Sequence, residues 1–106
     1  MNKTLTIDGK DMEFAANAAT PIRFNQVFRE DLMKVAQGDN ADYYGTITKL
    51  AYIMNAQARG EGYKDMNFDA FVEWLEGFSS MAFVDKADEI IEIWMDSNDT
   101  KSTPKK

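Results

Sequence analysis

The sequence predicts an α+β domain that is mainly α, with an N-terminal β-hairpin, about four helices and a flexible polar C-terminal tail. Three observations lead to this fold class. Apolar residues alternate around an Asp-Gly pair near the N-terminus, apolar residues then recur at helical spacing as far as residue 96, and the last ten residues contain no apolar side chain. The 106 residues suit one globular domain over residues 1–96 and a tail over residues 97–106.

The first predicted element is a hairpin over residues 3–16. Leu5 and Ile7 alternate with polar residues before Asp8-Gly9, and Met12 and Phe14 alternate after it. Alternating runs around Asp-Gly are a strong signal for a two-residue hairpin turn. Because an isolated two-stranded hairpin is marginal in water, we expect its apolar face to pack on the helices.

Thr20-Pro21 predicts the start of a first helix, at about residues 21–37, which Gly38 ends. Threonine is a good helix cap, and proline suits the first helical position. A second helix is expected at about residues 42–58. The predicted inward faces comprise Phe24, Val27, Phe28, Leu32, Val35 and Ala36 in the first helix, and Tyr43, Ile47, Leu50, Ala51, Met54 and Ala58 in the second.

Asn67 is expected to cap a third helix, at about residues 68–77, and Ser79 or Ser80 a fourth, at about residues 81–96. The predicted inward faces comprise Phe68, Phe71, Val72, Leu75 and Phe78 in the third helix, and Val84, Ala87, Ile90, Ile91, Trp94 and Met95 in the fourth. The opposite face of the fourth helix is acidic, with Asp85, Asp88, Glu89, Glu92 and Asp96. Such a two-sided helix favours the handling of other proteins over chemistry.

The charge distribution argues against nucleic-acid and membrane partners. The chain carries a net charge of −6, and its last eight residues hold three lysines and one aspartate, which leaves −8 on residues 1–98. Such a body repels phosphate and anionic lipid surfaces. No apolar run reaches the ~20 residues of a membrane span, and the N-terminus lacks the apolar stretch of a secretory signal. With no cysteine present, a cytoplasmic location is expected.

The residue types also argue against an enzyme. The chain contains no histidine and no cysteine, which removes the usual general base and thiol nucleophile. The carboxylates lie on predicted polar helix faces, where solvation is their ordinary state. The segment Gly60-Glu61-Gly62 lacks the Gly-Lys-Ser/Thr ending of a phosphate loop. We therefore expect no cofactor and no metal site.

Large apolar side chains near the edges of the predicted stripes are the candidates for protein binding. Tyr52 is predicted to lie opposite the apolar stripe of its helix, Trp74 at the edge of its stripe, and Met33 off the main face. Single exposed apolar residues are normal, but several together favour self-association or a partner groove. The candidate protein-binding residues are Met33, Tyr52, Trp74, Phe78 and Trp94.

The order of the segments adds a family resemblance. The segments that carry it are residues 5–10, 13–14, 18–21, 23–24, 28–32, 51–54, 71–75 and 90–94. In this order they resemble the tail assembly chaperones of long-tailed (siphovirus-type) bacteriophages, in the version found in phages and prophages of Gram-positive bacteria. The likeness spans residues 4–95.

The resemblance implies a protein that binds the tape measure protein, keeps it soluble and helps to recruit tail tube subunits during tail assembly. It implies a longer, frameshifted form that contacts the tail tube protein, a place in the host cytoplasm, and absence from the mature virion. It supplies no catalytic residues. Self-association into a homo-oligomer stays open, and so does an alternative function as a small acidic regulatory module, such as a phage-encoded inhibitor or DNA mimic.

Overall fold

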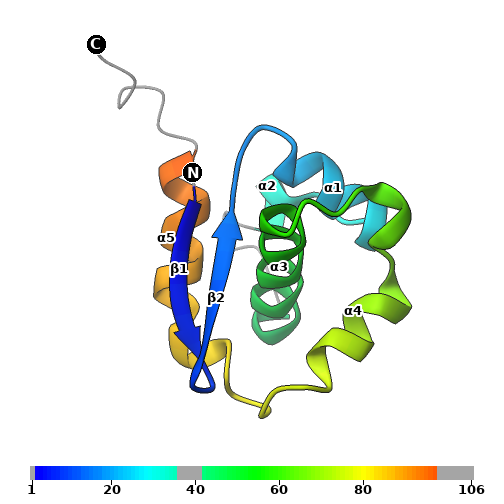
Figure 1. Ribbon diagram of the computed structural model, residues 1–106. Helices are drawn as coiled ribbons and strands as arrows, with labels where there is room; N and C mark the ends of the chain where they lie inside the picture. The colour runs from blue at the N-terminus through cyan, green and yellow to red at the C-terminus, as the bar shows by residue number, and fades with distance from the viewer. Residues whose placement is uncertain (1, 36–41, 98–106) are drawn as a thin grey trace.

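The computed structural model describes residues 2–35 and 42–97, and it confirms the mainly helical α+β class with an N-terminal hairpin (Figure 1). In chain order the elements are β1 (Asn2–Ile7), β2 (Lys10–Ala15), α1 (Thr20–Phe28), α2 (Leu32–Val35), α3 (Tyr43–Ala58), the 3-10 helix η1 (Tyr63–Asp65), α4 (Phe68–Leu75), the 3-10 helix η2 (Val84–Lys86) and α5 (Ala87–Ser97). The predicted tail, residues 98–106, lies outside the described residues.

Helix α3 is the centre of the fold. It lies between the hairpin and α4 (Figure 1) and packs against β2, α1, α4 and α5. Its buried residues run almost without a break from Thr46 to Ala56. A helix that is buried on nearly every side is a core helix, and the other elements form a shell around it.

The hairpin follows the prediction closely. Strands β1 and β2 pair antiparallel, and Asp8 and Gly9 form the turn with φ angles of 55° and 78°. Positive φ at both central residues is the turn geometry that matches the twist of the strands, and Asp-Gly favours it. The apolar side chains of Leu5, Ile7 and Phe14 are buried on one face of the hairpin.

The hairpin turn is tied to the segment between α4 and η2. Both carboxylate oxygens of Asp8 accept hydrogen bonds from Ser79, one from the backbone N–H at 2.7 Å and one from the hydroxyl at 2.8 Å. Lys10 donates to the carbonyl of Gly77 and lies over the ring of Phe78. These contacts join residues about seventy positions apart in the chain.

We refer to the two hydrogen bonds between Asp8 and Ser79 as the clamp. It predicts that the protein loses stability in acid. The hydrogen bonds from Ser79 lower the pKa of Asp8 below its ordinary value of 3.8. The stabilisation is therefore fully present above that pH and is lost as the pH falls through the lowered value. We expect Asp8→Asn to be less stable than the parent in urea at pH 7, and the difference to shrink as the pH approaches roughly 2.

The matched control for this prediction is Asp96→Asn, which removes the same charge from an exposed position of α5. Its stability is expected to stay within about 0.5 kcal/mol of the parent at both pH values. Equal urea midpoints for Asp8→Asn and the parent at pH 7 would contradict the clamp.

The predicted first helix is wrong in its length. The chain leaves α1 at Arg29, whose φ is 58°, and a separate short helix α2 begins at Leu32. The side chain of Asn25 donates to the carbonyl of Glu30, and Asp31 accepts from the backbone N–H of Met33, so polar side chains stabilise the break. Residues 36–38, which include the predicted end of this helix, lie outside the described residues.

The predicted start of the first helix also needs a correction. Helix α1 begins at Thr20, and the cap position is Ala19. The Thr20 hydroxyl instead accepts from the backbone N–H of Asn17 and donates to the side chain of Gln57 in α3. The buried threonine therefore joins α1 to the central helix.

The last two predicted helices are shorter than expected. Asn67 caps α4 as predicted, but α4 ends at Leu75. Helix α5 begins only at Ala87, after turns over residues 80–83 and the 3-10 helix η2, and this segment buries the side chain of Phe83. Neither Ser79 nor Ser80 caps this helix, since both lie several residues before its start, and the Ser79 hydroxyl donates to Asp8 instead.

Several predicted inward positions are exposed. These are Tyr43, Phe68, Val72 and Met95. On α5 the buried residues are Ala87, Ile90, Ile93 and Trp94, so Ile93 takes the place predicted for Met95.

None of the helices in the described ranges combines the length and hydropathy of a membrane-spanning segment.

Candidate protein-binding surface around α4

Aromatic rings hold α4 against the central helix. The ring of Phe71 lies 5.0 Å from that of Phe28 and 5.5 Å from that of Tyr52, measured between centroids. The ring of Trp74 stacks on Phe83 at 4.8 Å. Edge-to-face and stacked pairs of this kind contribute beyond the area that they bury. The rings therefore fix where the outer face of α4 points.

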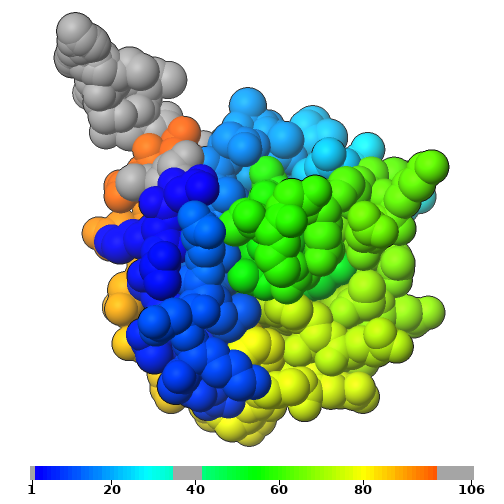
Figure 2. All heavy atoms as spheres, viewed as in Figure 1, coloured from blue at the N-terminus to red at the C-terminus, as the bar shows by residue number. Residues whose placement is uncertain are grey.

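The outer face of α4 carries an apolar strip, which consists of Phe68 and Val72. Phe68 is 55% exposed and Val72 is 37% exposed. They stand four residues apart, so they share one face of the helix. The Phe68 ring also contacts Phe28, with centroids 6.5 Å apart. In Figure 2 the segment from η1 through α4 (green to yellow) forms one side of the molecule, next to the hairpin (blue).

Exposed carboxylates lie along one side of the apolar strip. They belong to Asp69, Glu73 and Glu76 of α4 and its C-cap. An apolar contact area with an acidic border suits a polypeptide partner, because the apolar residues give contact area and the charges keep the surface hydrated.

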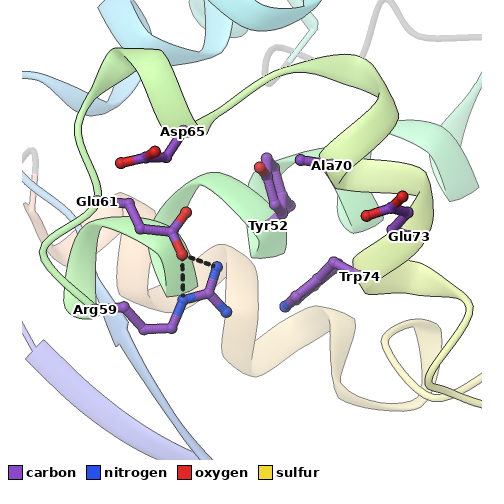
Figure 3. Close-up of a pocket in the computed structure, with 7 residues that line it drawn as sticks. All are labelled: Tyr52, Arg59, Glu61, Asp65, Ala70, Glu73 and Trp74. Carbon is purple, nitrogen blue, oxygen red and sulfur yellow. Dashed lines mark hydrogen bonds and ion pairs between the residues drawn. The ribbon is translucent and has the colours of Figure 1, made fainter.

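A pocket lies between the C-terminal end of α3, η1 and α4 (Figure 3), and we refer to it as the Tyr52 pocket. Its volume is about 500 Å³. The lining residues are Tyr52, Arg59, Glu61, Asp65, Ala70, Glu73 and Trp74.

The side chain of Asn55 forms hydrogen bonds with two residues that line this pocket. Its side-chain oxygen accepts from Arg59 and from the indole N–H of Trp74, the latter at 3.1 Å. Its amide nitrogen donates to the carbonyl of Glu13 in β2 at 2.9 Å. Arg59 is also bound to Glu61, with both contacts at 2.9 Å. One buried amide thus connects the hairpin, α3 and α4.

The hydroxyl of Tyr52 is buried and has no hydrogen-bond partner among the described residues. Burial raises its pKa first, and the charge of Glu61 raises it further. The Asn67 backbone N–H, which lies near the oxygen without meeting hydrogen-bond geometry, lowers the pKa by less. A buried hydroxyl without a partner is costly, so this atom marks an unusual point in the fold.

The structure does not bring the five predicted binding residues together on one surface. Trp74 and Phe78 are half-buried near α4. Met33 is 49% exposed on α2, where it lines a shallow hollow with Ile22 and Pro21. Tyr52 and Trp94 are 1% and 2% exposed, so the placement of Tyr52 opposite the buried stripe is wrong, and both side chains belong to the core.

Sequence reasoning missed the apolar strip, because periodicity assigned Phe68 and Val72 to the inward face. One sequence signal could have corrected this assignment. Phe68 directly follows the cap residue Asn67, and Phe71 and Trp74, three residues apart, provide an alternative inward face for so short a helix.

The predicted acidic face is present, but it is shared between η2 and α5. Asp85 of η2 and Asp88, Glu92 and Asp96 of α5 are exposed, and Glu89 lies 3.8 Å from Lys86 in an ion pair. Residues 2–35 and 42–97 contain no group of three or more acidic side chains placed to hold a metal ion.

Comparisons of the chain with protein-family models, with curated proteins and with solved structures gave no match.

Proposed function

We propose that this protein is a tail assembly chaperone that binds the tape measure protein of a long-tailed bacteriophage and keeps it soluble until tail tube subunits arrive. The sequence resemblance supports this proposal, and so does the agreement of the fold with a hairpin followed by helices. The observation that carries the proposal is the apolar strip of Phe68 and Val72, which is exposed, contacts the rings beneath it and has carboxylates beside it.

The proposed mechanism is reversible masking. A tape measure protein exposes long apolar helices before the tube surrounds it, and each chaperone would cover a short stretch with its apolar strip. Many such contacts, each of them weak, together keep the chaperones bound to the client, and they still allow stepwise release. In this proposal a longer frameshifted form recruits the tail tube protein, the complex forms in the host cytoplasm, and the mature virion lacks the chaperone.

The experiment is co-expression of the tape measure protein with the parent chain or with the double variant Phe68→Ser/Val72→Ser. We expect the parent to keep the client in the soluble fraction and to co-purify with it at low salt. The double variant should bind at least about tenfold more weakly, because each buried apolar side chain contributes roughly 1.5 kcal/mol or more at an interface.

The matched control is Met81→Ser/Met95→Ser, which removes two side chains of similar exposure away from α4. It should retain the client. Urea unfolding checks that both double variants stay folded. If the parent and the Phe68→Ser/Val72→Ser variant keep equal amounts of client soluble, the strip is not the binding surface. If the parent itself fails to bind, the chaperone function is wrong.

The second candidate is a small acidic regulatory module, favoured by the exposed carboxylates of α5. It would bind a basic protein through charge, so its binding should disappear as added salt screens the charges. Neutral replacement of Asp85, Asp88, Glu89 and Glu92 should abolish this binding and leave the α4-dependent client binding unchanged.

A further inference from the structure

We propose that the Tyr52 pocket binds a cationic side chain, that of lysine or arginine, from a partner polypeptide. This inference goes beyond the chaperone function and does not depend on the partner being a tape measure protein. It comes from two independent observations, which are the charge of the pocket wall and the unpartnered hydroxyl at its floor.

The charge of the wall favours a cation over an anion. Three lining residues, Glu61, Asp65 and Glu73, are carboxylates, and only Arg59 is cationic. Glu61 and Asn55 already engage the Arg59 guanidinium. An incoming anion would therefore meet an occupied cation and two further carboxylates, whereas an incoming cation finds a wall with a net charge of −2 from these residues.

The remaining lining groups suit the same ligand. Tyr52 and Trp74 pack edge-to-face with their centroids 5.3 Å apart, and Trp74 also stacks on Phe83, so these rings give the pocket an apolar wall beside its carboxylates. The hydroxyl oxygen of Tyr52 points toward the space between Asp65 and Ala70 in Figure 3. A bound N–H donor would give that oxygen the partner that no described residue provides.

The pocket and the apolar strip lie on different faces of α4. The α4 residues that line the pocket are Ala70, Glu73 and Trp74, and about 100° of rotation per residue places them roughly opposite Phe68 and Val72. A partner segment could therefore place a lysine or arginine in the pocket without contacting the strip, and the cation would fix the register of that segment.

The test uses two short peptides, acetyl-Ala-Lys-Ala-amide and acetyl-Ala-Arg-Ala-amide, and NMR of the two tryptophan indole N–H groups. Trp74 lines the pocket and Trp94 is buried elsewhere, so the chain contains its own internal control. We expect a saturable shift of the Trp74 signal and no shift of the Trp94 signal. The neutral peptide with ε-acetylated lysine should give no saturable shift.

Two variants test the two observations separately. Glu73→Gln should weaken binding of the cationic peptides roughly two- to fivefold, while Glu92→Gln on α5 should leave it unchanged. Tyr52→Phe keeps the ring and removes the hydroxyl. It should fold at least as stably as the parent, because the lost group has no partner, and it should bind the peptides more weakly.

Some outcomes would overturn the proposal. One is the absence of a saturable Trp74 shift with either cationic peptide, which would indicate that the pocket holds water only. Another is an equal shift with the acetylated peptide, and a third is unchanged affinity in both Glu73→Gln and Tyr52→Phe. If the parent chain binds the cationic peptides but does not keep the tape measure protein soluble, only the chaperone function is wrong.

Discussion

Replacement of Phe71 by alanine is expected to destabilise the protein by about 3–5 kcal/mol, the usual range for removing a large buried aromatic side chain. Phe71 is 5% exposed and its ring contacts those of Phe28, Tyr52, Phe68 and Trp74. No other ring of α4 contacts both Phe28 and Tyr52 among the described residues. Its removal leaves a cavity between α1, α3 and α4.

The effect should be concentrated on α4, because the ring contacts are its main attachment to the core. In Phe71→Ala, hydrogen exchange at residues 68–75 should speed up more than exchange in α3, and the near-ultraviolet circular dichroism of the aromatic residues should decrease. The matched control is Phe68→Ala on the same helix, which should cost about 1 kcal/mol or less because Phe68 is mostly exposed. Equal destabilisation by the two variants would show that Phe71 does not anchor α4.

The elements that the sequence predicted well are those with local causes. The hairpin depends on an Asp-Gly turn and on alternation over a few residues, and both strands formed with Leu5 and Phe14 buried. The start of α4 depends on the Asn67 side chain, which accepts from the backbone N–H of Ala70 at 2.8 Å. Such signals need no knowledge of tertiary neighbours.

The elements that the sequence predicted poorly have non-local causes. Phe24 and Leu32 stand eight residues apart, which fits one continuous helix, so periodicity could not reveal the break at Arg29. The burial of Tyr52 depends on α4, which covers a face of α3 that would otherwise be exposed. Helical spacing defines faces of one helix but does not give the number of neighbours around it.

The candidate site was predictable only in part. The sequence identified Trp74 as a candidate and the acidic character of the surface, but it could not bring Arg59, Asp65 and Glu73 to one pocket. That arrangement requires the chain to reverse direction through η1 between α3 and α4. Similarly, nothing local to Asp8 shows that its carboxylate binds Ser79.

Replacement of Asn55 by alanine is the second change with a large expected effect, about 2–4 kcal/mol of destabilisation. Asn55 is 5% exposed, and its side chain makes three hydrogen bonds to three different parts of the fold. Alanine would leave the Glu13 carbonyl, the Arg59 guanidinium and the Trp74 indole N–H without this partner. Each such loss costs roughly 1–3 kcal/mol where water cannot replace the bond.

The matched control is Thr48→Ala, a second buried polar residue of α3. The Thr48 hydroxyl donates only to carbonyls of its own helix, those of Tyr44 and Gly45. Its loss should cost about 1 kcal/mol or less, because those carbonyls belong to the helix backbone and alanine is a better helix former. Urea unfolding of both variants measures the difference, and equal costs would contradict a bridging role for Asn55.

A double-mutant cycle measures how much the bond between Asn55 and Trp74 contributes to stability. Trp74→Phe removes the indole N–H and keeps an aromatic ring, so the loss of the Asn55–Trp74 bond is shared between the two single variants. We expect the double variant to be less destabilised than the sum of the single variants by about 0.5–3 kcal/mol. Asn55→Ala should also weaken binding of the lysine peptide, because Trp74 and Arg59 lose the partner that orients them. Full additivity with unchanged peptide affinity would mean that the Asn55–Trp74 bond contributes neither to stability nor to the pocket.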